Sequence, residues 1–220
     1  MTTRTRTHRL LCAAVAGSLA FLAAGCGDSD DGKAVDDYVT ADKLCGGGAV
    51  TKDAAKALEV ITGETRFAAS GTYSTVADAA EVLTREAVPA ASGRGDICRL
   101  YPEAPVDELR VTWDLSNMPW SGEPAAPKFT ILPMGERAGA AHDTAYVTFP
   151  CSHKEHPLAR PDYISVWVEA RRPTEPEGDV RPLKNAYVTL AHSFAQAMAK
   201  ELGCENNGGL KPKPSLIPAP

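Results

Sequence analysis

The chain has 220 residues, of which 23 are Lys or Arg and 28 are Asp or Glu, so its formal net charge at pH 7 is −5. This length is enough for one domain or for two small lobes. An acidic balance argues against nucleic acid and anionic lipid headgroups as partners of the folded part of the chain, because both are negatively charged. We therefore expect no nucleic-acid partner.

The N-terminus has the pattern of an export signal. Arg4, Arg6 and Arg9 occur without any acidic residue, and an apolar run from Leu10 to Ala24 follows them. These are the charged n-region and the apolar h-region of a signal peptide. The run is shorter than the roughly 20 residues that a membrane-spanning helix needs. We therefore expect residues 1–25 to be a signal peptide that is removed.

The signal ends in Leu22-Ala23-Ala24-Gly25-Cys26, which resembles the lipobox of bacterial lipoproteins. The resemblance implies that the Cys26 thiol receives a diacylglyceryl group and that Cys26 becomes the first residue of the mature chain. Each buried methylene of such a lipid contributes about 0.8 kcal/mol, so two acyl chains hold a protein on a membrane persistently. We predict a lipid anchor on Cys26, with the membrane as its partner. The alternative is an ordinary secretory signal that happens to end in cysteine.

Processing at this site leaves 195 residues and moves the net charge from −5 to −8, because three arginines leave with the signal. Residues 26–37 are rich in Gly and Asp and predict an acidic, flexible tether. We assign residues 38–205 to a single α+β domain. Residues 206–220 contain Asn-Asn-Gly-Gly and Lys-Pro-Lys-Pro, which predict a disordered tail.

Four cysteines remain in the body of the chain, and consecutive ones are 53 residues apart: Cys45, Cys98, Cys151 and Cys204. An even number of cysteines in an exported protein indicates disulfide bonds. Four cysteines allow three pairings. We favour Cys45 with Cys98 and Cys151 with Cys204, because each pair would join a helix end to a strand region within one half of the chain.

Three helices are predicted. Thr51 can cap a helix that ends at Gly63, and Thr75 to Asp78 approximates a capping box for a second helix that ends before Pro89. The third helix has apolar residues at steps of four, three, four and four. These residues are Leu183, Tyr187, Leu190, Phe194 and Met198. On this helix His192 falls on the side away from the apolar stripe, so we expect it to face solvent.

The middle of the chain predicts five strands, because it is rich in Val, Ile, Thr and aromatic residues between Gly and Pro. The strands are Ile97–Tyr101, Leu109–Leu115, Lys128–Leu132, Thr144–Phe149 and Tyr163–Ala170. In Leu109–Leu115 apolar and polar residues alternate, which predicts a sheet with one covered face. We therefore predict an α+β fold in which an antiparallel sheet of about five strands is covered by two N-terminal helices and one long C-terminal helix.

Signatures of catalysis are absent from the sequence: it contains no Gly-x-Ser-x-Gly, His-Glu-x-x-His or Cys-x-x-Cys motif and no phosphate-binding loop. His153 and His156, with Glu155 between them, form a weak candidate for a metal site. A solvated polar loop is the alternative. His142 has no evident partner in the sequence. We expect no cofactor and assign no catalytic residue.

Trp120 is a candidate contact residue. It lies between Ser116 and Pro127, in a segment rich in Pro and Gly, and an aromatic side chain on a semi-rigid loop can anchor a ligand or partner. The alternative is that Trp120 folds back onto the core, since Trp is usually largely buried.

Taken together, the lipobox at Cys26, the acidic tether and a small disulfide-bearing domain resemble the uncharacterised secreted lipoproteins of actinobacteria. The resemblance implies a lipid anchor on the extracellular face of the cell membrane and no assigned reaction. It leaves two hypotheses. The first is a non-enzymatic protein that binds a small ligand or another envelope protein through the Trp120 loop or the open face of the sheet. The second is a membrane-anchored hydrolase or metal-dependent enzyme that uses His142, His153 or His156.

Overall fold

The computed structural model describes residues 38–68, 74–86, 92–102, 106–116, 126–152, 162–171 and 176–218. The chain divides into one unit of residues Met1–Val35 and a second of Asp36–Pro220, and all described residues belong to the second. No helix among them is both long enough and apolar enough to cross a membrane.

The centre of the fold is a six-stranded sheet in the order β3-β4-β8-β7-β6-β5, in which every neighbouring pair is antiparallel. Its strands are β3 (Ser92–Leu100), β4 (Glu108–Ser116), β5 (Thr130–Leu132), β6 (Arg137–Ala140), β7 (Thr144–Cys151) and β8 (Asp162–Arg171). The predicted α+β class with an antiparallel sheet is confirmed, but the sheet has six strands instead of five. Strand β6 was missed because its sequence, Arg-Ala-Gly-Ala, contains no β-branched or aromatic residue.

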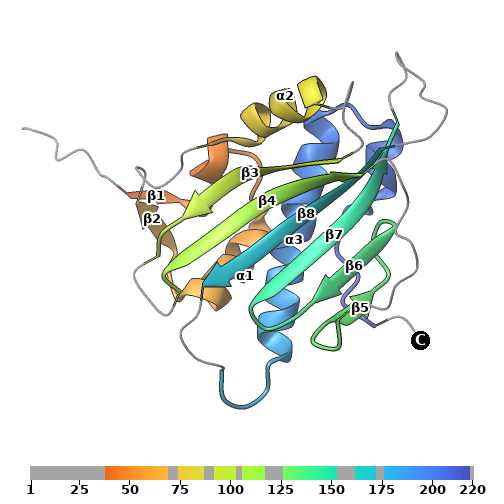
Figure 1. Ribbon diagram of the computed structural model, residues 1–220. Coiled ribbons are helices and arrows are strands. Elements are labelled where there is room, and N and C mark those ends of the chain that lie inside the picture. Colours follow the sequence, from red (N-terminus) through yellow and green to blue (C-terminus); the bar gives the residue numbers. More distant parts are fainter. Residues whose placement is uncertain are drawn as a thin grey trace, which may run out of the picture. The chain divides into compact units, whose positions relative to one another are not determined.

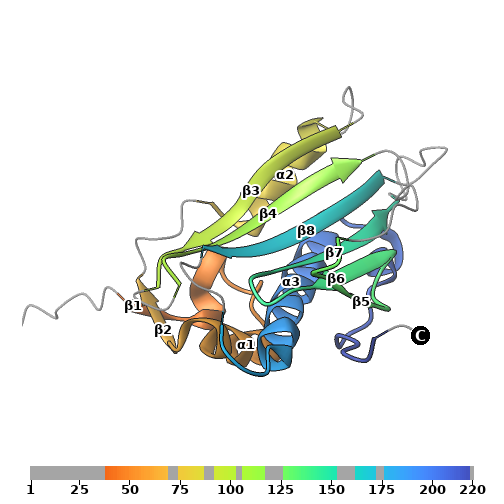
Figure 2. The same ribbon diagram turned by 60° about the horizontal axis from the view of Figure 1, so that its bottom comes forward.

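The described helices lie on one face of this sheet (Figures 1 and 2). The long helix α3 (Arg181–Glu201) packs against β7 and β8, while α2 (Val76–Glu86) packs against β3 and α3. Helix α1 (Lys52–Thr62) packs mainly on α3. The predicted cover of two N-terminal helices and one long C-terminal helix is therefore confirmed only in part, because α1 packs mainly on α3.

The ends of α1 form as the sequence predicts. The Thr51 hydroxyl accepts a hydrogen bond from the Ala54 amide at 3.3 Å, and Gly63 ends the helix in the left-handed conformation with φ of 77°. The Ser193 hydroxyl of α3 accepts from the Thr51 amide at 3.0 Å and donates to the Ala49 carbonyl at 2.7 Å. The start of α1 is thus fixed to the middle of α3.

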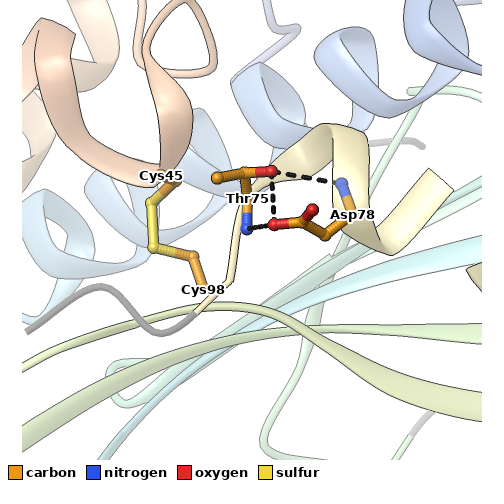
Figure 3. The surroundings of a disulfide bond; sticks show 4 residues. All are labelled: Cys45, Thr75, Asp78 and Cys98. Carbon is orange, nitrogen blue, oxygen red and sulfur yellow. Dashed lines mark hydrogen bonds between the residues drawn. A yellow bond between two sulfur atoms is a disulfide. The ribbon is translucent and has the colours of Figure 1, made fainter. Parts of the chain in front are cut away.

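The predicted capping box of α2 also forms (Figure 3). The Asp78 carboxylate accepts from the Thr75 amide at 3.0 Å, and the Thr75 hydroxyl accepts from the Asp78 amide at 3.1 Å. Gly46 approaches this cap so closely that a Cβ there would lie 2.8 Å from the Thr75 Cβ. The cap of α2 therefore lies directly against the turn that carries Cys45.

Two disulfides form in the predicted pairing, Cys45–Cys98 and Cys151–Cys204. Cys45 belongs to the 3₁₀ segment η1 (Ala41–Gly46) and joins it to β3, next to the cap of α2 (Figure 3). Cys151 ends β7, and Cys204 follows α3.

A second sheet, which the sequence did not predict, has two antiparallel strands, β1 (Tyr38–Thr40) and β2 (Arg66–Ala68).

The alternation in β4 separates a core face from an outer face. Leu109, Val111, Trp113 and Leu115 are buried, whereas Arg110 is exposed and Asp114 is half-buried. A Cβ on Gly95 of β3 would lie 2.7 Å from the Trp113 indole, so only glycine leaves room for this ring.

The C-terminal segment differs from the predicted disordered tail. Glu205–Gly209 forms the 3₁₀ segment η3, and Leu210 is buried. Gly208 lies against Phe149 of β7, where a Cβ would be 2.6 Å from the ring. The Cys151–Cys204 bridge starts this segment beside β7, so its apolar residues can pack despite the Pro, Gly and Asn content.

The expectation that His192 faces solvent is wrong, because its exposed fraction is 2%. The C-terminal segment covers this side of α3: His192 forms a hydrogen bond with the backbone of Lys211, and the Gln196 amide donates to the Lys211 carbonyl at 2.7 Å. Burial lowers the pKa of His192, and the bond to Lys211 opposes this shift.

Candidate functional site

The face of the sheet opposite the helices is the candidate functional site. None of the described helices or strands lies on it (Figures 1 and 2). We call it the open face. The outward residues of β4 alternate with its core residues, and their cross-strand partners on β3 and β8 point the same way. The open face is therefore built from side chains of adjacent strands in fixed register.

Ion pairs organise the part of the open face formed by β3 and β4. Asp96 accepts hydrogen bonds from Arg99 at 2.6 Å and from Arg110 at 2.7 Å, and Arg94 forms a two-point pair with Asp114. Burial alone would raise the pKa of Asp96, but the bonds from Arg99 and Arg110 hold it below its ordinary value. The Arg110 side chain is thus paired with Asp96 of β3.

The same geometry leaves charges on β8 without partners. The residues that directly face each other across β4 and β8 are Arg110 with Glu169 and Glu108 with Arg171. Arg110 turns toward Asp96, and a Glu108 carboxylate oxygen lies 3.6 Å from Arg99. Within the part of the chain that the structure describes, neither Glu169 nor Arg171 forms an ion pair. Two opposite charges therefore remain available on one strand.

An aromatic cluster lies next to these charges. The Phe129 ring meets the Tyr146 ring edge-on at 5.3 Å between centroids and the Trp167 ring at 6.4 Å, and Tyr146 and Trp167 are 4.6 Å apart. Gly139 of β6 makes room for Tyr146, since a Cβ there would lie 2.6 Å from the ring. Burial raises the pKa of Tyr146, with Arg137 opposing, so the phenol stays neutral. The cluster packs Phe129, which directly precedes β5, against side chains of β7 and β8.

A hollow of about 340 Å³ opens between the aromatic cluster and the ion pairs. We call it the charged hollow. Three acids and three bases line it: Glu108, Asp143, Glu169, Arg110, Lys128 and Arg171. Thr144 also lines it and is only 5% exposed. The Thr144 hydroxyl and one Asp143 carboxylate oxygen are buried without a hydrogen-bond partner among the described residues.

Such unpaired atoms are unusual, because most buried polar atoms in proteins are hydrogen-bonded and leaving one unpaired costs about 1–3 kcal/mol. Lys128 lies 3.6 Å from the same Asp143 oxygen, which is an ion-pair distance but not a hydrogen bond. The indole nitrogen of Trp167, on the same face, is a third buried atom of this kind. The charged hollow therefore combines unpaired charges with unpaired hydrogen-bonding groups.

The structure describes only some of the residues that the sequence singled out. Cys26, Trp120, His153 and His156 lie outside the described residues. His142 is half-buried in the turn between β6 and β7. Among the described residues no three His, Cys, Asp or Glu side chains come together in a way that could hold a metal ion.

Sequence reasoning missed the charged hollow, although part of its signal was present. The alternation in Leu109–Leu115 predicts a sheet with one covered face, but the lack of ion pairs for Glu169 and Arg171 depends on β3 lying beside β4. The role of Lys128, Asp143 and Thr144 depends in addition on the pairing of β7 with β8. These are long-range contacts that periodicity along one strand does not contain.

No protein-family model matches the chain, and neither the curated proteins nor the solved structures that were compared with it include a match.

Proposed function

We propose that this chain is a lipoprotein of the bacterial cell envelope, anchored through Cys26 on the extracellular face of the cell membrane, and that it works by binding rather than by catalysis. The binding surface in this proposal is the open face of the sheet. Its ligand is a small molecule or a segment of another envelope protein. The resemblance to actinobacterial secreted lipoproteins implies the anchor and no assigned reaction, and the absence of catalytic motifs from the sequence favours binding.

The anchor is supported by the N-terminal pattern. Three arginines, an apolar run and small residues precede Cys26. The first described strand begins at Tyr38, twelve residues after Cys26, which leaves a spacer between a lipid and the domain. Two disulfides in the domain suit an oxidising compartment outside the cytosol.

Binding is supported by one observation above all: Glu169, Arg171 and the Thr144 hydroxyl line the charged hollow, and among the described residues the two charges form no ion pair and the hydroxyl forms no hydrogen bond. Folding normally pairs buried polar groups within the protein. The buried Thr144 hydroxyl can instead pair with a ligand, and the cost of leaving it unpaired is then recovered on binding. Glu169 and Arg171 are exposed, so they contribute charge to the surface rather than such a cost.

Metabolic labelling with a fatty acid tests the anchor. The full-length chain is expected to take up label, and Cys26→Ala is expected to take up none. A Cys45→Ala/Cys98→Ala variant is the control, because it removes thiols elsewhere and leaves the lipobox intact. Equal label on wild type and Cys26→Ala, or no label on either, would reject the anchor.

Affinity capture from crosslinked membranes tests the binding surface. Charge reversal of both unpaired residues, Glu169→Lys with Arg171→Glu, keeps the net charge and is expected to abolish capture of whatever the wild-type chain retains. The matched control is Lys200→Glu with Glu201→Lys at the exposed end of α3, which also reverses two charges and keeps the net charge. Capture that survives the double reversal would exclude the open face as the surface.

A further inference from the structure

We propose that the charged hollow binds a short peptide by its free ends, with Glu169 receiving the ammonium group and Arg171 the carboxylate. This inference rests on the proposed function and names the ligand class of the same site. The ligand is a zwitterion about two residues long.

The first reason is the competition between strands for charge partners. On an antiparallel sheet, directly opposed residues are close enough to pair, so Arg110 and Glu169 would ordinarily satisfy each other. Asp96 on β3 instead holds Arg110 at 2.6 Å. Glu108, the strand partner of Arg171, likewise lies 3.6 Å from Arg99. The pKa of Arg94 is raised by its hydrogen bonds to Asp114 and, to a smaller extent, by the Glu169 charge. Among the described residues Glu169 and Arg171 nevertheless form no ion pair, and both belong to the same face of β8.

The second reason is spacing. Residues two apart on a strand are about 6.6 Å apart along it, since the rise is about 3.3 Å per residue. An extended dipeptide has the same repeat, so its two termini are separated by a similar distance. A dipeptide lying along β8 can therefore place one end near Glu169 and the other near Arg171.

The third reason is the set of hydrogen-bonding groups beside Glu169. Thr144 of β7 is directly opposite Glu169, and its buried hydroxyl has no partner among the described residues. Asp143 presents in the adjacent position a buried oxygen that accepts no hydrogen bond among the described residues and lies 3.6 Å from Lys128. An ammonium group has three donors to distribute, and the three acceptors here match that number.

The balance of charge excludes ligands of one sign. The charged hollow has three acids and three bases, although the chain as a whole is acidic. A simple anion would bring its charge close to Glu108, Asp143 and Glu169, and a simple cation would approach Arg110, Lys128 and Arg171. Only a ligand with both charges meets a complementary group at each end. The volume of about 340 Å³ is at the small end of the range for ligand sites, about 300–1000 Å³.

Isothermal titration calorimetry at neutral pH with three probes tests this assignment: Ala-Ala, N-acetyl-Ala-Ala, which lacks the ammonium group, and Ala-Ala-amide, which lacks the carboxylate. Saturable binding is expected for Ala-Ala, and each blocked form is expected to bind about tenfold or more weakly, as for loss of one charge-assisted hydrogen bond.

Two variants assign the ends. Glu169→Gln is expected to lower the affinity for Ala-Ala about tenfold, and it should then bind N-acetyl-Ala-Ala as well as Ala-Ala. Arg171→Gln is expected to lower the affinity for Ala-Ala by the same factor, and it should then bind Ala-Ala-amide as well as Ala-Ala. Glu201→Gln is the control and should bind as wild type does. Circular dichroism confirms that each variant is folded, which is expected because Glu169 and Arg171 are exposed.

Three results would overturn the proposal: no saturation with Ala-Ala up to about 10 mM, the weak limit of useful affinity; equal binding of the blocked peptides; or unchanged binding by both variants. If calorimetry gives one of these results while membrane capture still depends on Glu169 and Arg171, the peptide assignment is wrong and the open face remains a binding surface. If capture also ignores the charge reversal, the proposed binding surface itself is wrong.

Discussion

The two disulfides provide an internal comparison, because both close loops with a sequence separation of 53 residues. The loop-entropy relation assigns each bridge about 4 kcal/mol at 25 °C from its constraint on the unfolded chain. In that relation the stabilisation depends on the loop length alone. Removing either bridge, as Cys45→Ala/Cys98→Ala or as Cys151→Ala/Cys204→Ala, should therefore lower the free energy of unfolding by the same amount.

The folded surroundings of the two bridges are different, which makes the comparison informative. Cys45–Cys98 joins η1 to an edge strand, whereas Cys151–Cys204 starts the C-terminal segment. That segment has further support, since the Glu205 amide donates to the Ser152 carbonyl at 2.9 Å and Leu210 is buried. All four cysteines are buried, so alanine replaces each without burying a new polar group.

Urea unfolding followed by circular dichroism measures both losses, with peptide mapping to verify the remaining bridge. The dependence of the free energy on urea should rise in both variants, because the unfolded chain exposes more surface without the crosslink. Losses that differ by more than about 2 kcal/mol would refute the reasoning. The bridge with the larger loss would then act mainly through contacts in the folded state.

Three further predictions concern single residues. Burial lowers the pKa of His192, so just below pH 6.5 the unfolded chain binds more protons than the folded chain, and the free energy of unfolding should fall as the pH drops through this window. Urea unfolding at several pH values should show a smaller pH dependence for His192→Gln than for wild type. Gly139→Val should displace Tyr146 and cost about 1–3 kcal/mol, seen as a lower melting temperature and a changed near-ultraviolet spectrum; an unchanged spectrum would contradict the close contact. Asp78→Ala should cost about 1 kcal/mol in urea unfolding by removing its bonds to Thr75, and a loss near zero would show that the cap contributes nothing.

Local sequence signals located the elements whose stability is local. Thr51 and Thr75 were identified as helix caps, and the 3.6-residue period placed α3, because these signals depend on neighbours within one turn. In β4 the alternation of Leu109, Val111 and Trp113 with polar residues separated the two faces correctly.

The features that sequence reasoning missed are set by distant contacts. His192 is buried because residues near Lys211 return across α3, and helical periodicity cannot show this. Strand β6 forms because β5 and β7 flank it, although its own residues favour no strand. The charged hollow needs β3, β4, β7 and β8 in register, so no single strand predicts it.

Site-specific photocrosslinking in intact cells tests the central claim most directly. A photoreactive amino acid replaces Glu169 on the open face in one strain and Glu201 on α3 in another, each in the full-length chain. Binding through the open face predicts a crosslinked adduct from position 169 and none from position 201. The same adducts from both positions, or adducts from position 201 alone, would contradict the assignment of the open face as the binding surface.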